Sequence, residues 1–211
     1  MIGISAANLA LLEIAELIHK MQQIVISEPN PDWAGEYRVI AEDLRALLKQ
    51  DAGRIDHIGS TAVPGLAAKD VIDLQITVSD LTEPTTITRL TQAGYELRDE
   101  IEFDNLVGRP TDDPALQKRY LTEPQGQRPI HIHVRETGRL NQIYALLFRD
   151  YLRADATTRS AYAQIKRQLA ARFPDNASAY YAIKDPYMDT IYQAACLWRD
   201  ATSWTPDEDY L

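Results

Sequence analysis

The chain has 211 residues, 45% hydrophobic and 25% charged, which is enough to bury a core as one large globular domain or two small ones. A formal net charge of −9 argues against a general nucleic-acid-binding protein, because such a protein needs a basic surface, although a local basic pocket stays open. Cys196 is the only cysteine, no apolar run reaches membrane-spanning length and the N-terminus lacks a signal-peptide pattern. We therefore expect a cytoplasmic protein that has no internal disulfide and does not enter a membrane.

The sequence pattern of the N-terminal part predicts a helix, a short strand and a second helix. Apolar residues recur at helical spacing in 6–22, and we interpret this helix as one that docks on the core, with dimerisation as the alternative. Residues 24–26 predict a short strand. Asp32 is then expected to cap a helix whose buried face carries five apolar residues, namely Trp33, Tyr37, Ile40, Leu44 and Leu47.

The central stretch combines two strands with two turns. Residues 55–58 predict a short strand, Gly59-Ser60 interrupts it, and Pro64-Gly65 marks a second turn. From residue 71 to residue 78 apolar and polar residues alternate, as in a strand with one buried face. This alternation places Asp73 and Gln75 side by side on the face opposite the core.

The remaining elements alternate between helices and strands. A helix over 82–93 should end at Gly94, and a strand should begin at residue 95. The acidic segment 98–115 is expected to be mostly loop, either a solvated surface loop or one that gates a site. Residues 118–121 and 129–134 predict a hairpin whose second strand carries three polar residues on one face: His131, His133 and Arg135. Three helices should follow, starting near residue 140, after Asp155 and at Pro186.

Several of these segments together resemble the GrpB family. They are His57-Ile58-Gly59-Ser60-Thr61-Ala62-Val63-Pro64-Gly65, Pro31-Asp32-Trp33, His131-Ile132-His133-Val134 and Phe148-Arg149-Asp150-Tyr151-Leu152. The resemblance extends over about residues 24 to 200. This family belongs to the nucleotidyltransferase-fold superfamily and also occurs fused to the C-terminus of dephospho-CoA kinases. The resemblance implies an α/β fold with a mixed twisted sheet and a helical C-terminal half. We accordingly expect an N-terminal helical extension (1–23), an α/β core (24–139) and C-terminal helices packed on that core (140–211).

The resemblance also implies where the chemistry lies. In the nucleotidyltransferase fold a Gly-Ser turn opens a helix against the phosphates of the substrate, which assigns phosphate or nucleotide binding to Gly59, Ser60 and Thr61. The following strand offers two carboxylates to magnesium. Asp73 stands at the first of these positions, but the second is the neutral Gln75.

Three interpretations of this face remain open. The first is a pocket for a nucleotide or another phosphorylated substrate, with Asp73, Gln75, His131 and His133 as catalytic residues and magnesium or manganese as cofactor. The second is a transition-metal site, such as a zinc site, in which His57 would join Asp73, His131 and His133. The third is a polar layer that only orders the sheet.

The helical half adds basic residues that could meet a substrate phosphate. Arg149, Lys166 and Lys184 match basic positions of the family, and surface solubility is the alternative for each of them. The expected function is therefore a phosphate- or nucleotide-binding pocket, in a metal-dependent enzyme similar to the nucleotidyltransferases. The rival is a non-catalytic accessory domain that helps a protein partner such as dephospho-CoA kinase to fold.

Overall fold

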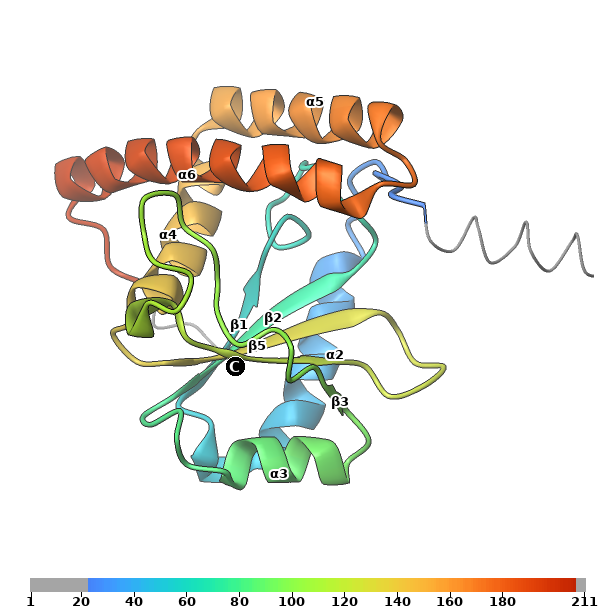
Figure 1. Cartoon of the computed structure of the whole chain (residues 1–211), viewed down its shortest axis with the longest axis vertical. Coiled ribbons are helices and arrows are strands. Elements are labelled where there is room, and N and C mark those ends of the chain that lie inside the picture. The colour runs from blue at the N-terminus through green and yellow to red at the C-terminus, as the bar shows by residue number, and fades with distance from the viewer. Residues whose placement is uncertain (1–22, 208–211) are drawn as a thin grey trace, which may run out of the picture.

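A five-stranded mixed sheet organises the chain, as the computed structural model of residues 23–207 shows (Figure 1). The strand order is β1-β2-β5-β4-β3. The helix expected at 6–22, and with it the question of docking or dimerisation, lies outside the described residues. The strands are β1 (Arg54–Ile58), β2 (Ile72–Val78), β3 (Glu96–Leu97), β4 (Arg119–Thr122) and β5 (Ile130–Glu136). The helices are α2 (Trp33–Leu48), η1 (Lys49–Asp51), α3 (Thr85–Gln92), η2 (Pro114–Leu116), α4 (Leu140–Ala154), α5 (Ala156–Arg172) and α6 (Ala177–Thr202).

The central strands β2 and β5 run parallel, and every other strand pair is antiparallel. Asp73 is paired with His131 and Gln75 with His133, so the polar faces of the two strands coincide. Tyr120 of β4 is the next residue across from His133. The register thus places the predicted polar residues on one face of the sheet.

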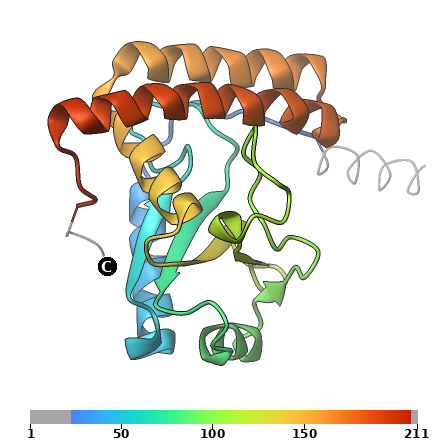
Figure 2. The same ribbon diagram turned by 60° about the vertical axis from the view of Figure 1, so that its left-hand side comes forward.

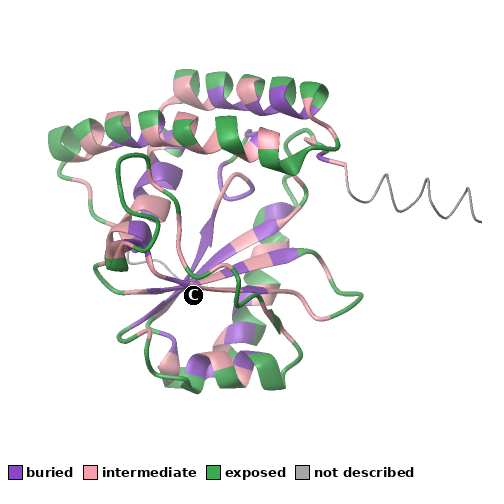
Figure 3. Ribbon diagram, viewed as in Figure 1, coloured by how far each residue is buried: buried purple, intermediate pink, exposed green. Residues whose placement is uncertain are grey.

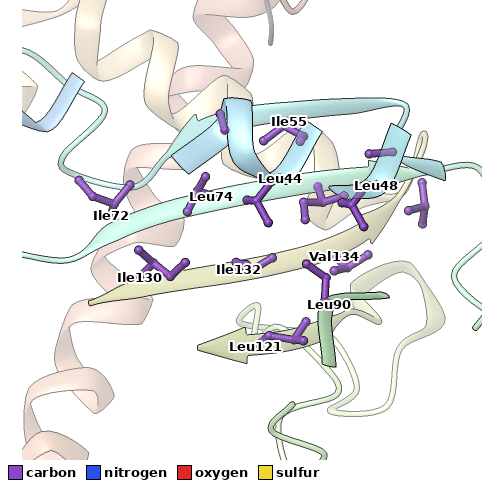
Figure 4. Close-up of a cluster of buried hydrophobic side chains, with 14 of the residues drawn as sticks. Leu44, Leu48, Ile55, Ile72, Leu74, Leu90, Leu121, Ile130, Ile132 and Val134 are labelled. Atoms are coloured by element: carbon purple, nitrogen blue, oxygen red, sulfur yellow. The ribbon is translucent and has the colours of Figure 1, made fainter. Parts of the chain in front are cut away.

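The other face of the sheet forms the main hydrophobic core (Figure 4). The alternating residues of β2 are buried there, as predicted, and α2 and α3 cover them with Leu44, Leu48 and Leu90. Burying a leucine side chain contributes about 1.5–3 kcal/mol, so this layer supplies much of the stability. Buried and half-buried residues follow one another along the central strands, and exposed residues gather in the loops and on the outer faces of the helices (Figure 3).

The helical C-terminal half packs on the polar side of the sheet. α5 and α6 run side by side across one end of the strands, and α4 descends from them (Figures 1 and 2). Val63 and Leu66 of the segment between β1 and β2 are buried against Phe148, Tyr162 and Ile191. This shared cluster joins the two parts of the chain. The mixed α/β class with a helical C-terminal half is thereby confirmed, while the exact domain division stays a prediction.

One predicted element does not form, and another begins earlier than predicted. Residues 24–26 form no strand, because Ile24 donates its N–H to the carbonyl of Pro174 and the segment makes a single bridge, from Ser27 to Ala68. The last helix begins at Ala177, well before Pro186, which lies inside it. Proline removes one hydrogen bond but keeps a helical φ, and the flanking aromatic residues pack well enough to continue the helix.

The side chain of Asp32 does not cap α2, although the helix begins where it was predicted. Asn30 accepts the N–H of Asp32 instead. By contrast, Asp155 caps α5 through the N–H of Thr158, as expected. None of the helices within residues 23–207 has the length and apolar character that crossing a membrane requires.

Candidate functional site

A pocket of about 480 Å³ lies between the polar face of the sheet and the helical half. This volume is in the range of small-ligand sites. Its wall includes eight of the residues predicted for the site: Gly59, Ser60, Thr61, Asp73, His131, His133, Lys166 and Lys184. Three predicted residues, His57, Gln75 and Arg149, are not part of the wall. Asp73, His131 and His133 line one cleft, as expected, while their role as a functional site stays a prediction.

Gly59 lets β1 and β2 approach each other closely at the pocket. Its φ is +70°, and a Cβ atom there would lie 2.3 Å from Oδ2 of Asp73. Only glycine combines this backbone conformation with that distance. The helix expected after Gly59-Ser60 does not form, because Pro64 lacks an N–H and the chain makes successive turns. Val63 donates its N–H to Ser60 and Leu66 donates to Val63.

Asp73 and His131 form a hydrogen-bonded pair on the floor of the pocket. The distance from Nδ1 of His131 to Oδ1 of Asp73 is 2.9 Å. Burial raises the pKa of the Asp73 carboxyl, but the hydrogen bond and charge of His131, with Lys69, outweigh it and hold the pKa below its usual value. An ionised carboxylate only accepts, so Nδ1 carries the proton in this pair.

Gln75 is fully buried and held in place by a neighbouring guanidinium group. Its Oε1 accepts from Nη1 of Arg135 at 2.7 Å, and its Nε2 donates to the carbonyl of Gln142 at 3.2 Å. Arg135 also bonds Asp104 at 2.9 Å and lies 3.2 Å from Nδ1 of His133. Burial and the charge of Arg135 keep the pKa of His133 well below its usual value. The positive charge of Arg135 therefore lies directly beside Gln75, the position at which a second metal ligand was expected.

These residues do not fit a magnesium or zinc centre. His57 is turned away, with its Nε2 3.0 Å from Oγ1 of Thr61 and its ring stacked on Tyr37. Burial lowers the pKa of His57 to about 3, so it is neutral in the fold. Within residues 23–207 no group of three or more His, Cys, Asp or Glu side chains is arranged to hold a metal. The four residues predicted as metal ligands are thus not brought together as a ready-made site.

The three predicted basic residues have different roles. Lys166 is 3% exposed, and its Nζ donates to Oγ of Ser60 at 2.7 Å and to the carbonyl of Ala67 at 2.6 Å. Lys184 pairs with Asp185 on the pocket wall. Arg149 is buried outside the pocket, bonded to Asp150 and to the carbonyl of His57. We interpret Arg149 as a structural link between α4 and β1.

Several pocket residues were missed from the sequence. Lys69 precedes β2 and donates to the hydroxyl of Tyr181. Lys118 precedes β4 and pairs with Asp104 at 2.6 Å. The signal for them is strand alternation, because Lys118 and Tyr120 are two residues apart and Tyr120 is paired with His133 on the polar face.

The comparisons with known proteins identify the family. The GrpB protein family matches residues 23–194. The crystal structure of conserved protein GrpB from Enterococcus faecalis is 30% identical, with a TM-score of 0.67, and the match covers 82% of this chain and 99% of that one. The Cid1 poly(U) polymerase matches at 17% identity and a TM-score of 0.47 over 77% of this chain and 48% of that one.

A dephospho-CoA kinase of Mycolicibacterium paratuberculosis is 38% identical over 194 residues, which is 84% of this chain and 47% of the kinase. The chain therefore spans about half the length of the curated relatives that it matches first. The family match spans most of the chain, and it includes the Gly-Ser turn, the Asp73–His131 pair and the helices that close the pocket. The chain belongs to the GrpB family.

Proposed function

We propose that the pocket binds a phosphorylated small molecule, and a nucleotide in the first place. The observation that carries this proposal is a pair of pocket lysines, Lys69 and Lys166, for which the structure of residues 23–207 gives no carboxylate within ion-pair distance. Lys166 is buried and Lys69 is half-buried, and an ammonium group removed from water is costly without a counter-ion. A phosphate group would supply the missing negative charge.

The other cations of the pocket are already neutralised by carboxylates. Lys118 and Arg135 share Asp104, and Lys184 pairs with Asp185. Lys69 and Lys166 therefore remain as the phosphate ligands, and the Ser60 hydroxyl lies beside Lys166. Tyr120 and Tyr181 add aromatic rings to the wall, on which a base could stack.

Magnesium-dependent nucleotidyl transfer does not follow from this arrangement. That reaction needs at least two carboxylates around the metal ions, whereas Asp73 is bonded to His131 and Gln75 to Arg135. The nucleotidyltransferase fold that the family resemblance implies accounts for the position of the pocket. The proposed binding of a phosphate group accounts for the two lysines of the pocket that have no carboxylate partner within residues 23–207.

A thermal-shift screen tests the proposal. The panel contains ATP, GTP, CTP, UTP, coenzyme A and pyrophosphate, each with and without magnesium. A ligand at a hundred times its dissociation constant stabilises the fold by about 2.7 kcal/mol, or about 5–10 °C for a chain of this length. Lys166→Met should abolish the shift, and Arg199→Met, at an exposed ion pair outside the pocket, should retain it. A screen without any shift would refute the proposal.

A second candidate function is that of an accessory domain for a dephospho-CoA kinase. The observation in its favour is the 38% identity to a part of such a kinase. In this case the chain should raise the refolding yield of a separately expressed kinase domain, and Lys166→Met should do so equally well. An unchanged yield would count against the accessory role.

A further inference from the structure

Ser60 and Lys166 meet in the pocket although 106 residues separate them. Ser60 follows Gly59 on the turn after β1 and lies on the pocket wall, half-buried. Lys166 comes from the middle of α5, and its Nζ lies 2.7 Å from Oγ of Ser60. This distance allows direct proton transfer between hydroxyl and amine. Phosphate binding would use the hydroxyl and the amine as two separate donors, and the hydrogen bond between them adds the possibility of proton transfer.

We propose that Ser60 is a nucleophile and Lys166 its general base, so that the pocket holds a serine–lysine dyad for acyl transfer. The geometry is that of an activated nucleophile, in which a hydroxyl is bonded to a buried base that a third group orients. The carbonyl of Ala67, 2.6 Å from Nζ, is the orienting group. That the acyl group is carried by a phosphorylated molecule rests on the proposed function, whereas the dyad itself does not.

The surroundings of Lys166 suit a base. From α6 it faces Lys184, from the segment before β2 it faces Lys69, and Arg167 is next to it on α5. Asp73 favours the charged form of Lys166, but its influence is smaller than that of Lys184. Burial, followed by Lys184, lowers the pKa of Lys166 to about 7. While no anion is next to Lys166, a large share of the amine is therefore neutral near pH 7–8, compared with about one in a thousand for an exposed lysine.

The reaction balances without a metal or an oxidant. The Ser60 hydroxyl gives its proton to neutral Lys166 Nζ while Oγ attacks the carbonyl carbon of an ester or thioester. The bond to the leaving group then breaks, the leaving group takes the bonding electron pair and the proton from Lys166, and an acyl-Ser60 remains. Water attacks this ester, gives one proton to Lys166 and releases the acid, after which Lys166 returns the proton to Ser60. Lys69, which has no carboxylate partner among the ion pairs of residues 23–207, lines the same wall and would stabilise the negative charge of the intermediate.

Acyl transfer fits better than phosphoryl transfer at this dyad. A transferring phosphoryl group carries several negative charges, which enzymes commonly neutralise with divalent cations. The residues around Asp73 do not fit such a cation, because Asp73 is bonded to His131 and Gln75 is bonded to Arg135. A carbonyl group develops only one negative charge when attacked, and a single lysine can compensate for it.

Covalent labelling with phenylmethanesulfonyl fluoride tests the dyad, because the reagent loses fluoride to an activated serine. We expect one adduct per chain, which peptide mass spectrometry locates at Ser60, formed at a rate that rises with pH through about 7. Ser60→Ala should give no adduct at this peptide. Ser160→Ala, at an exposed serine of α5, should be labelled as fast as the natural protein.

The lysine variants separate a base from a structural contact. Lys166→Met and Lys166→Arg should each slow the labelling of Ser60 at least about 100-fold, since general-base catalysis contributes about 10²–10⁴-fold and arginine cannot act as the base. Melting curves show which variants are folded, and Lys166→Arg keeps the charge if Lys166→Met does not fold. An unlabelled Ser60 in the folded natural protein, or equal rates in a folded lysine variant, would overturn the dyad. Neither result would contradict the proposal of nucleotide binding, because the thermal-shift screen tests that proposal separately.

Discussion

Replacing Gly59 by alanine tests the close approach on which the pocket floor depends. The added Cβ atom would lie 2.3 Å from Oδ2, 2.8 Å from Cγ and 2.9 Å from Cβ of Asp73. All three distances are shorter than van der Waals contact. Rotating the Asp73 side chain can relieve the first two, but the third involves its Cβ, so β1 and β2 must also separate slightly.

The cost follows from three contributions. A left-handed φ costs an alanine about 1–2 kcal/mol. Moving the Asp73 carboxylate breaks its bond to His131, a charged hydrogen bond worth about 1.5–3 kcal/mol. Overpacking between the strands adds about 1–3 kcal/mol. We therefore expect Gly59→Ala to lower the free energy of unfolding by at least about 4 kcal/mol.

Gly65→Ala is the matched control, because Gly65 has a φ of +77° and no atom within 4 Å of the added Cβ. It should cost only the backbone contribution of about 1–2 kcal/mol. In urea unfolding the midpoints of the two variants should differ by about 1 M. In an Asp73→Ala background the extra cost of Gly59→Ala should shrink, as a double-mutant cycle would show. Equal midpoints for the two glycine variants would refute the reasoning.

Three further predictions concern buried polar residues. Because neutral His57 has a pKa of about 3 in the fold and about 6.5 when unfolded, the unfolded chain binds more protons between these values, and stability falls as the pH drops through this range. Urea unfolding from pH 7 to pH 4 should show a shallower decline for His57→Phe, and an unchanged decline would contradict this. Arg149→Met should cost about 3–5 kcal/mol in the same assay, compared with under about 1 kcal/mol for the exposed Arg199→Met, and equal costs would make Arg149 a surface residue. Calorimetry should detect no tight magnesium binding to the natural protein or to Gln75→Asp, because Arg135 would pair with the new carboxylate, and a tight site in either would contradict this.

The fold was predictable where periodicity alone decides it. Alternation in 71–78 gave the buried face of β2, and turn residues gave the β4–β5 hairpin. The parallel pairing of β2 with β5 was not predictable from alternation, because it joins residues 58 positions apart. The start of α6 was missed because Pro186 is a common helix start, whereas here packing on both sides of it outweighs one lost hydrogen bond.

The site was predictable in its strands but not in its helices. Asp73, His131 and His133 share the pocket because strand alternation fixes their face. Arg149 was expected in the pocket, but its neighbour Phe148 lines it, and one residue turns a helix by about 100°. The contact between Ser60 and Lys166 depends on how α5 crosses the end of the sheet, and local sequence does not specify that crossing.

The distribution of positive charge explains how an acidic chain can bind an anion. Four of the six lysines line the pocket, while many of the arginines form ion pairs elsewhere on the described surface. A lysine carries a compact charge on a flexible stem and can follow a ligand phosphate, whereas the planar fork of arginine suits fixed pairs with carboxylates. The net charge of −9 of the whole chain repels long polyanions but leaves a small phosphorylated molecule free to enter such a pocket. The same acidic balance that argues against nucleic-acid binding would thus make the proposed phosphate pocket selective for small anions.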